Sequence, residues 1–204
     1  MRVAIVGGTG DFGLALAARL VEAGDDVVIG SRDAGRAQEK ASGIGCSGAE
    51  NETAAAGAEL VVLATDADAA IATARQLRPV LDSPVLCVAS QLVWSGGKPR
   101  PPARASAVAE EVSLVVDVPV TAGLHSLAAG KLAHGRPDED AFVCGDDAEA
   151  KAQALELAAK VVAGRALDAG PLASARALEG MTAVIVNLNK RYKGHAGVRV
   201  TGLP

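Results

Sequence analysis

The sequence predicts an α/β fold of the Rossmann type, with a doubly wound, mainly parallel sheet and a small C-terminal α/β extension. Two observations support this prediction. Short apolar runs rich in β-branched residues, typical of strands buried on both faces, alternate with longer segments of helical period. A glycine-rich turn also stands where the first apolar run ends and the first helix should begin. This alternation implies right-handed crossovers and a ligand site beyond the carboxyl ends of the strands.

The first unit of the chain is a strand, a glycine turn and a helix. Residues 2–6 are an apolar run, residues 8–13 follow as G-x-G-x-x-G, and residues 14–23 favour a helix that Gly24 ends. In such a turn the glycines allow a tight bend, contact between a pyrophosphate and bare backbone, and close packing of helix on strand. The first N–H groups of the helix face the phosphate. We interpret the turn as a dinucleotide site; the alternative is a purely structural glycine turn.

The end of the second strand indicates which dinucleotide binds. An NAD site usually has Asp or Glu there to bind the ribose 2′-hydroxyl. Here the strand at 27–29 runs into Ser31 and Arg32, with Arg36 one helical turn further on. A hydroxyl and two guanidinium groups suit a 2′-phosphate, which predicts NADP, although Asp33 lies nearby. The alternative is that both arginines only solvate the start of a helix.

The rest of the chain continues the alternation. Further strands are expected at 59–65, 85–89, 114–116, 141–145 and 165–168. Helices are expected at 50–58, 66–81 and 106–112, between 145 and 165, and at 173–193. Residues 90–102 are the longest irregular stretch, and long loops in compact domains tend to be functional or mobile. We expect an NADP-binding domain at 1–120 and a small C-terminal domain at 121–204, and the family resemblance described below implies that the second domain closes the cofactor cleft.

Composition narrows the class of partner. The net charge is −4, only 2% of residues are aromatic, and no block rich in Lys or Arg occurs, so neither a nucleic acid nor an anionic membrane is an expected partner. No apolar run has the length of a membrane span, and no basic leader precedes the first strand. The three cysteines and three histidines lack ligand spacing. We expect a cytoplasmic protein with reduced thiols and no metal site.

The predicted topology gathers candidate residues at one edge of the sheet. They are residues 9–12, 31–32, 65–66, 89–90 and those that follow Val120. Asp66 and Asp68 suggest a base or a ligand pair, but Asp is also favoured at a helix N-terminus by capping and by the helix dipole.

Several motifs along the chain resemble one family. They are VGGTGDFGLALAARL, VVIGSR, VLATDADAAIATARQL, GLHSLAAGKL, FVCGDDAEAKAQALELAAKV and ALDAGPLASARALEGMTAVIVNLN. In order and content they resemble the coenzyme F420-dependent NADP oxidoreductases, from Met1 to about Asn189. The glycine turn is common to many Rossmann proteins, whereas V-C-G-D-D and D-A-G-P-L are more specific.

The resemblance implies an activity and a set of binding residues. The reaction would be reversible hydride transfer between the nicotinamide C4 of NADP and the C5 carbon of the deazaflavin coenzyme F420, whose tail is long and anionic. Residues implied to bind the two coenzymes are Gly8, Thr9, Gly10, Asp11 and Phe12 at the pyrophosphate, Ser31, Arg32 and Arg36 at the 2′-phosphate, Thr65, Ala69, Ala89 and Ser90 at the nicotinamide side, and His125 and Ser126 near the deazaflavin.

Two departures from the family pattern concern the ring side of the cleft. The family has a proline and an aromatic residue where Asp66 and Ala67 stand, and a proline where Ala128 stands. Both departures therefore concern the second substrate and leave the NADP assignment unchanged. Hydride transfer between two coenzymes depends on positioning and on exclusion of water, so we assign no catalytic residue. His125 is the one candidate for a proton-related role; a buried structural histidine is the alternative.

Other functions remain open at this point. The same fold suits an NADPH-dependent reductase of a flavin, an imine or a carbonyl, and a redox sensor that binds NADP without turnover. Two groups of basic residues are candidates for the anionic tail, or else simple solvated surface: Lys98 and Arg100 in the long loop, and Lys190, Arg191 and Lys193 at the last helix. The apolar face of that helix is consistent with a homodimer or with packing on its own sheet.

Overall fold

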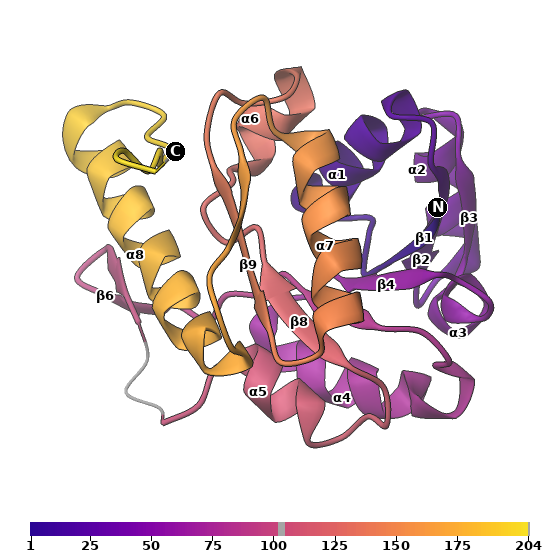
Figure 1. Ribbon diagram of the computed structural model, residues 1–204. Helices are drawn as coiled ribbons and strands as arrows, with labels where there is room; N and C mark the ends of the chain where they lie inside the picture. The colour runs from indigo at the N-terminus through magenta and orange to yellow at the C-terminus, as the bar shows by residue number, and fades with distance from the viewer. Residues whose placement is uncertain (102–104, 204) are drawn as a thin grey trace.

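The structure is a computed structural model that describes residues 1–101 and 105–203 (Figure 1). The strands are β1 (Arg2–Val6), β2 (Asp26–Ser31), β3 (Ser47–Glu50), β4 (Leu60–Leu63), β5 (Val85–Cys87), β6 (Val93–Ser95), β7 (Lys98–Arg100), β8 (Val120–Gly123), β9 (Ala141–Gly145) and β10 (Ala166–Asp168). The helices are α1 (Asp11–Glu22), α2 (Ala34–Ser42), α3 (Asn51–Ala55), α4 (Ala67–Leu77), α5 (Val108–Ser113), α6 (Ala129–His134), α7 (Ala148–Val161) and α8 (Ala175–Tyr192), with short 3-10 turns at Arg78–Val80 and Leu172–Ser174.

The strand order confirms the predicted Rossmann-type fold. One sheet has the order β10-β9-β8-β5-β4-β1-β2-β3. Within it, the six strands β8-β5-β4-β1-β2-β3 are each parallel to their neighbours. This part has the order of a dinucleotide-binding fold, and its direction of growth reverses between β1 and β4. Beyond β8 the sheet adds β9, which is antiparallel to β8, and β10, which is parallel to β9. A ligand crevice is therefore expected at the carboxyl ends of β1 and β4.

Helices cover both faces of the sheet and give three layers. Successive residues of a strand point to opposite faces. Val3 and Ile5 of β1 accordingly pack with α1, α2, α6 and α7, whereas Ala4 and Val6 pack with α3, α4, α5 and α8. The many alanines on these helices let the helices approach the sheet closely. In Figure 1, α8 lies at the opposite end of the molecule from β1, β2 and β3.

Two expectations about the elements need correction, and one strand was not expected. The apolar residues 114–116 do not form a strand: α5 ends at Ser113, Leu114 is exposed, and the strand that joins the sheet is β8 at Val120–Gly123. The stretch at 90–102 is not wholly irregular, because β6 and β7 form an antiparallel hairpin across Gly96 and Gly97. The sequence also gave no sign of β3, whose residues SGAE lack an apolar pattern.

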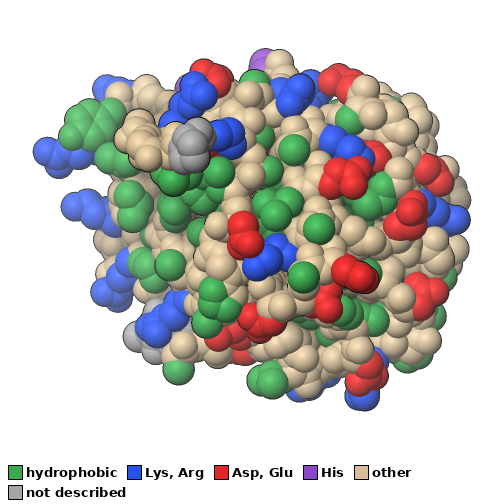
Figure 2. Space-filling model, viewed as in Figure 1, with side chains coloured by type: hydrophobic (Ala, Val, Ile, Leu, Met, Phe, Trp, Pro, Cys, Tyr) green, Lys and Arg blue, Asp and Glu red, His purple; other side chains and the backbone are tan. Residues whose placement is uncertain are grey.

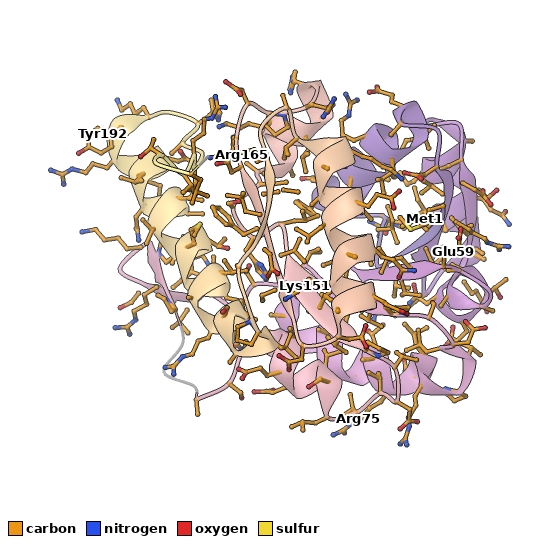
Figure 3. All side chains as sticks on the ribbon, in the orientation of Figure 1. Met1, Glu59, Arg75, Lys151, Arg165 and Tyr192 are labelled. Carbon is orange, nitrogen blue, oxygen red and sulfur yellow. The ribbon has the colours of Figure 1, made fainter. Side chains whose placement is uncertain are left out.

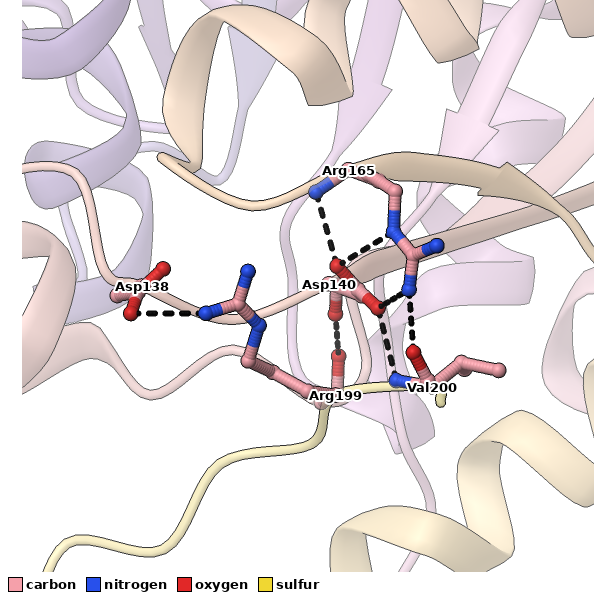
Figure 4. A network of polar contacts seen from close by, with 6 residues as sticks. Asp138, Asp140, Arg165, Arg199 and Val200 are labelled. Carbon is pink, nitrogen blue, oxygen red and sulfur yellow. Dashed lines mark hydrogen bonds and ion pairs between the residues drawn. The ribbon is translucent and has the colours of Figure 1, made fainter. Parts of the chain in front are cut away.

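The C-terminal part is joined closely to the rest of the chain. β8 pairs with β5, so the sheet continues across the expected domain boundary at residue 120, and the division into 1–120 and 121–204 stays a prediction. Past α8 the chain returns to β9 and β10 through polar contacts (Figure 4). Asp140 is buried and accepts hydrogen bonds from the side chain of Arg165 at 2.8 Å and from the N–H of Val200 at 2.8 Å. The Arg165 guanidinium holds the pKa of Asp140 well below its usual range.

In the part of the chain that the structure describes, no helix is both long and apolar enough to cross a membrane.

Candidate functional site

The glycine turn between β1 and α1 has the geometry of a phosphate-binding loop. A Cβ on Gly13 would come within 2.6 Å of the Cα of Gly8, so only glycine lets α1 pack this closely on the turn. Gly10 has φ −81° and ψ 166°, and a Cβ there would meet nothing within 4 Å among the described residues. Gly10 is also the N-cap of α1 and has no side chain to cap the helix. The turn therefore leaves open space in front of the first N–H groups of α1.

A pocket of about 310 Å³ lies at this turn, where the sheet order reverses. Its lining combines the turn, the end of β2 and the turn after β4: Gly7, Thr9, Gly10, Ser31, Arg32, Arg36, Asn51, Ala64, Thr65, Asp66, Ala69 and Thr73. We call it the phosphate pocket. It holds two guanidinium groups and several hydroxyls beside a helix N-terminus, which is the donor set that a phosphorylated dinucleotide requires.

The carboxylate nearest to the two arginines serves the backbone. Asp33 is the N-cap of α2 and accepts a hydrogen bond from the N–H of Arg36 at 3.0 Å. The N–H of Asp33 in turn donates to the hydroxyl of Ser31 at 3.2 Å. Asp33 does not line the phosphate pocket, whereas Ser31, Arg32 and Arg36 do. Asp33 therefore fixes the start of α2 and the position of Arg36, which removes the objection that it raised against NADP.

Asn51 lines the phosphate pocket and was missed in the sequence. It is buried, and its Oδ1 accepts the N–H of Gly7 at 3.4 Å. Asn51 directly follows β3, and β3 is the parallel neighbour of β2, so its carboxyl end lies at the same edge of the sheet.

Thr65 was expected in the site, and its buried hydroxyl has no hydrogen-bond partner among the described residues. An unpartnered hydroxyl at the pocket wall suits a polar ligand.

A second, larger pocket adjoins the first. It has a volume of about 830 Å³, and its lining consists of Asp66, Ala67, Asp68, Ala69, Ser90, Gln91, Leu92, Val93 and Trp94. Asp66 and Ala69 line both pockets, so the two form one cleft along the carboxyl ends of β1, β4 and β5. We call the second one the ring pocket. Gln91, Val93 and Trp94 were not expected there, because residues 90–102 showed no regular pattern.

The two aspartates at the start of α4 both line the ring pocket but have different surroundings. Asp66 is the N-cap residue, although its side chain makes no capping hydrogen bond. Asp68 stands in the first turn and accepts a hydrogen bond from Nε2 of Gln91 at 3.3 Å. Asp68 therefore connects α4 to the loop after β5, and its charge at the start of the helix agrees with the helix dipole.

His125 is buried and lines neither pocket of the cleft. It follows Leu124, a residue with φ +65°, which is rare outside glycine and marks strain at the end of β8. The side chain is 6% exposed, and neither ring nitrogen has a hydrogen-bond partner in the described part of the chain. Burial lowers the pKa of His125 to about 4, against a smaller opposing effect from the backbone of Ala89. The ring is therefore neutral at neutral pH.

Thr182 of α8 connects the ends of β5 and β8. Its hydroxyl donates to the backbone carbonyl of His125 at 2.9 Å and lies 3.0 Å from the hydroxyl of Ser90. A threonine hydroxyl can donate only one hydrogen bond, and that of Thr182 goes to the His125 carbonyl. Ser90 is therefore the donor in the contact between the two hydroxyls. Ser90 is therefore left to accept hydrogen bonds on the side of the ring pocket that it lines.

The structure brings together about half of the expected site residues. Thr9, Gly10, Ser31, Arg32, Arg36, Thr65, Ala69 and Ser90 line the cleft. The other expected residues do not line the cleft. Gly8 donates its N–H to the carbonyls of Ile5 and Gly30. Asp11 lines a separate groove between α1 and α6. Ala89 and His125 are buried, and the hydroxyl of Ser126 donates to the carbonyl of Asp140 at 3.3 Å. Phe12 packs against the core on the α1 face.

The fold and the cleft define a class of protein, a Rossmann-type nucleotide-binding protein. The sequence model of the family "NADP oxidoreductase coenzyme F420-dependent" matches residues 2–90. Over its full length the chain is 35% identical to the F420-dependent NADP reductase of Methanothermobacter thermautotrophicus, of which it covers 96%. The chain belongs to the family of coenzyme F420-dependent NADP oxidoreductases.

Solved structures agree with this assignment. A protein of Arthrobacter sp. FB24, provisionally assigned as an F420-dependent NADP reductase, superposes with a TM-score of 0.85 at 25% identity, covering 99% of this chain and 100% of that one. An imine reductase of Streptomyces aurantiacus has a TM-score of 0.63 at 24% identity, covering 95% of this chain and 62% of that one. The imine reductase likeness concerns the fold alone.

Proposed function

We propose that the chain is an oxidoreductase that transfers a hydride reversibly between NADP(H) and coenzyme F420. The observation that supports this most is the 33–35% sequence identity, over the full length of the chain, to three F420-dependent NADP reductases. The cleft fits both substrates, because a pocket with phosphate donors opens directly into a larger one. Neither pocket lining includes a His or Cys.

We assign the phosphate pocket to NADP. The first N–H groups of α1 and the open space at Gly10 would hold the pyrophosphate. Ser31, Arg32 and Arg36 would hold the 2′-phosphate, with Asp33 fixing the helix that carries Arg36. Thr65 and Asn51 complete the polar wall of this pocket.

The ring pocket would bring the two reacting rings together. When both coenzymes are bound, the hydride passes between the nicotinamide C4 and the deazaflavin C5. The protein's part is to hold the rings in contact and to exclude water, which requires no acid or base from the chain. Ser90 and Ala69 both line the pocket, and the Ser90 hydroxyl would accept a hydrogen bond from a ring substituent. His125 is neutral and lines neither pocket, which favours the structural role for it.

Steady-state kinetics test the proposal against the other reductase functions. NADPH oxidation would be followed with F420, with FMN and with a cyclic imine as acceptors. Turnover with F420 and none with FMN or the imine is the expected result. Turnover with FMN or the imine alone would favour a reductase of another substrate, and NADPH binding without any turnover would favour a sensor.

A homodimer stays a prediction. Val184 and Leu188 stand one helical turn apart on α8 and are 57% and 40% exposed, so they offer an apolar strip that a second copy would cover. Sedimentation velocity over a range of protein concentrations measures the oligomeric state directly.

A further inference from the structure

The hairpin β6–β7 and the end of α8 carry basic side chains and no carboxylate of their own, and the carboxylates beside them at the cleft are Asp66 and Asp68 at the start of α4. Residues 90–101 and 180–203 contain no Asp or Glu, although the whole chain has a net charge of −4. Figure 2 shows basic side chains along the edge over α8 and no acidic one on that edge in this view. We call this surface the basic edge and define it by five exposed residues: Lys98, Arg100, Lys190, Arg191 and Lys193.

The two parts of the basic edge are held together by three contacts. Nδ2 of Asn187 donates to the carbonyl of Pro99 at 2.9 Å, and Nζ of Lys190 donates to the carbonyl of Gly97 at 2.7 Å. The Lys190 ammonium also lies 4.3 Å from the centre of the Trp94 ring, a cation–π contact. The hairpin therefore keeps its cations next to those of the helix.

Trp94 connects the basic edge to the cleft. The side chain is 56% exposed, it lines the ring pocket with Ser90 and Asp66, and it carries Lys190 over its ring. The basic edge therefore starts at the rim of the ring pocket, and a ligand that extends out of this pocket past Trp94 would meet its cations first.

We infer that the basic edge binds the anionic tail of coenzyme F420, an inference that rests on the proposed function. Charge complementarity supports this inference, because a flexible polyanion attached to a ring in the ring pocket and leaving it past Trp94 would run beside the cations of the basic edge. These contacts do not involve the reacting atoms. The basic edge therefore strengthens binding of the coenzyme and leaves the rate of hydride transfer unchanged.

Two double variants remove charge from the basic edge without touching its tether at Lys190. One is Lys98→Gln with Arg100→Gln, and the other is Arg191→Gln with Lys193→Gln. The matched control is Arg2→Gln with Arg75→Gln, which removes the same charge at the amino ends of the strands. Figure 3 shows Arg75 on α4, far from Tyr192 at the end of α8. Binding would be measured by coenzyme fluorescence with F420 and with the deazaflavin ring system lacking its anionic tail.

The expected result is a selective loss of affinity. Each double variant should raise the dissociation constant and the KM for F420 about fivefold, since exposed charge pairs contribute modestly, with kcat unchanged. Binding of the tail-less ring system should not change, and the control should bind both compounds normally. Salt should weaken F420 binding to the unmodified protein more than to the variants. Equal effects on the two compounds, or no effect on either, would overturn the inference. Absence of turnover with both would instead overturn the proposed function, and the binding data would still decide about the basic edge.

Discussion

The hydroxyl of Ser90 donates a hydrogen bond to the hydroxyl of Thr182 over 3.0 Å, and this bond joins two segments 92 residues apart in the chain. The hydroxyl of Thr182 in turn donates a hydrogen bond to the backbone carbonyl of His125 at 2.9 Å. One side chain of α8 thus connects the end of β8 to the loop after β5, and that loop lines the ring pocket. The geometry of the ring pocket therefore depends on how α8 docks on the sheet.

Replacing Thr182 with Val should weaken both the fold and coenzyme binding. The variant leaves the His125 carbonyl without its donor, which should cost about 1–2 kcal/mol of unfolding free energy. It should also raise the KM for F420, because Ser90 loses its acceptor. Thr182→Ser keeps the hydroxyl and should restore most of both properties. Urea unfolding and steady-state kinetics measure the two effects, and a Val variant with unchanged stability and KM would show that the chain of contacts has no such role.

The two glycines of the phosphate loop should respond differently to added side chains. Gly10→Val should fold, because its φ of −81° suits any residue and nothing described lies within 4 Å of the new Cβ, but it should lose NADP binding because the side chain occupies the phosphate space. Gly13→Ala should be destabilised by about 1–3 kcal/mol, because its Cβ would stand 2.6 Å from Gly8. Thermal melts with calorimetric NADP titrations separate the two cases. Normal NADP affinity in a folded Gly10→Val protein would show that this turn is not the site.

Arg32 should account for much of the preference for NADP. Losing one charge-assisted contact to the 2′-phosphate costs on the order of 1.5–3 kcal/mol, or roughly 10- to 150-fold in affinity. Arg32→Ala should therefore weaken NADP binding by this factor and change NAD binding little. Isothermal titration with both dinucleotides provides the comparison. Unchanged NADP affinity would remove Arg32 from the assigned site.

The buried His125 should make the protein less stable in mild acid. Its pKa is lowered to about 4 in the folded state, against about 6.5 in an unfolded chain. Below pH 6.5 His125 is therefore protonated in the unfolded chain but stays neutral in the folded protein. The free energy of unfolding falls as the pH decreases, until His125 is also protonated in the folded protein near pH 4. Between pH 7.5 and 5 the loss is about 2 kcal/mol.

A His125→Gln variant isolates that contribution. Gln does not titrate, so the variant should lose about 2 kcal/mol less stability than the unmodified protein over the same pH interval. Urea unfolding at pH 7.5 and pH 5 measures both losses. Equal losses in the two proteins would mean that His125 does not carry the lowered pKa.

The sequence was a good guide where each element has a strong local signal. The strand β1, the glycine turn and α1 follow from a buried apolar run, fixed glycine spacing and a helix-forming segment, and Ser31, Arg32 and Arg36 follow from their position after β2. Local signals failed where pairing partners decide the structure. β3 consists of SGAE and is a strand because β2 lies beside it, whereas the apolar residues 114–116 have no strand to pair with.

The parts of the site that depend on distant contacts were also beyond the sequence. Asn51 lies at the phosphate pocket because β3 exists, and Trp94 lines the ring pocket because Lys190 and Asn187 hold the hairpin against α8. Thr182 joins Ser90 to His125 only through the docking of α8. The contacts of Ser90 with Thr182, Asn187 with Pro99 and Lys190 with Gly97 join residues 88 to 93 positions apart. No periodicity or spacing in the sequence predicts contacts at that separation.

Isotope transfer between the two coenzymes tests the central claim most directly. NADPH deuterated at C4, on each of its two faces in turn, would be mixed with oxidised F420 and the protein, and the reduced coenzyme would be examined by mass spectrometry and NMR. Direct hydride transfer in the ring pocket predicts that deuterium from one face alone appears at C5 of the deazaflavin. Loss of the label to water, or no reduction of F420 by a protein that binds NADPH well, would contradict the account.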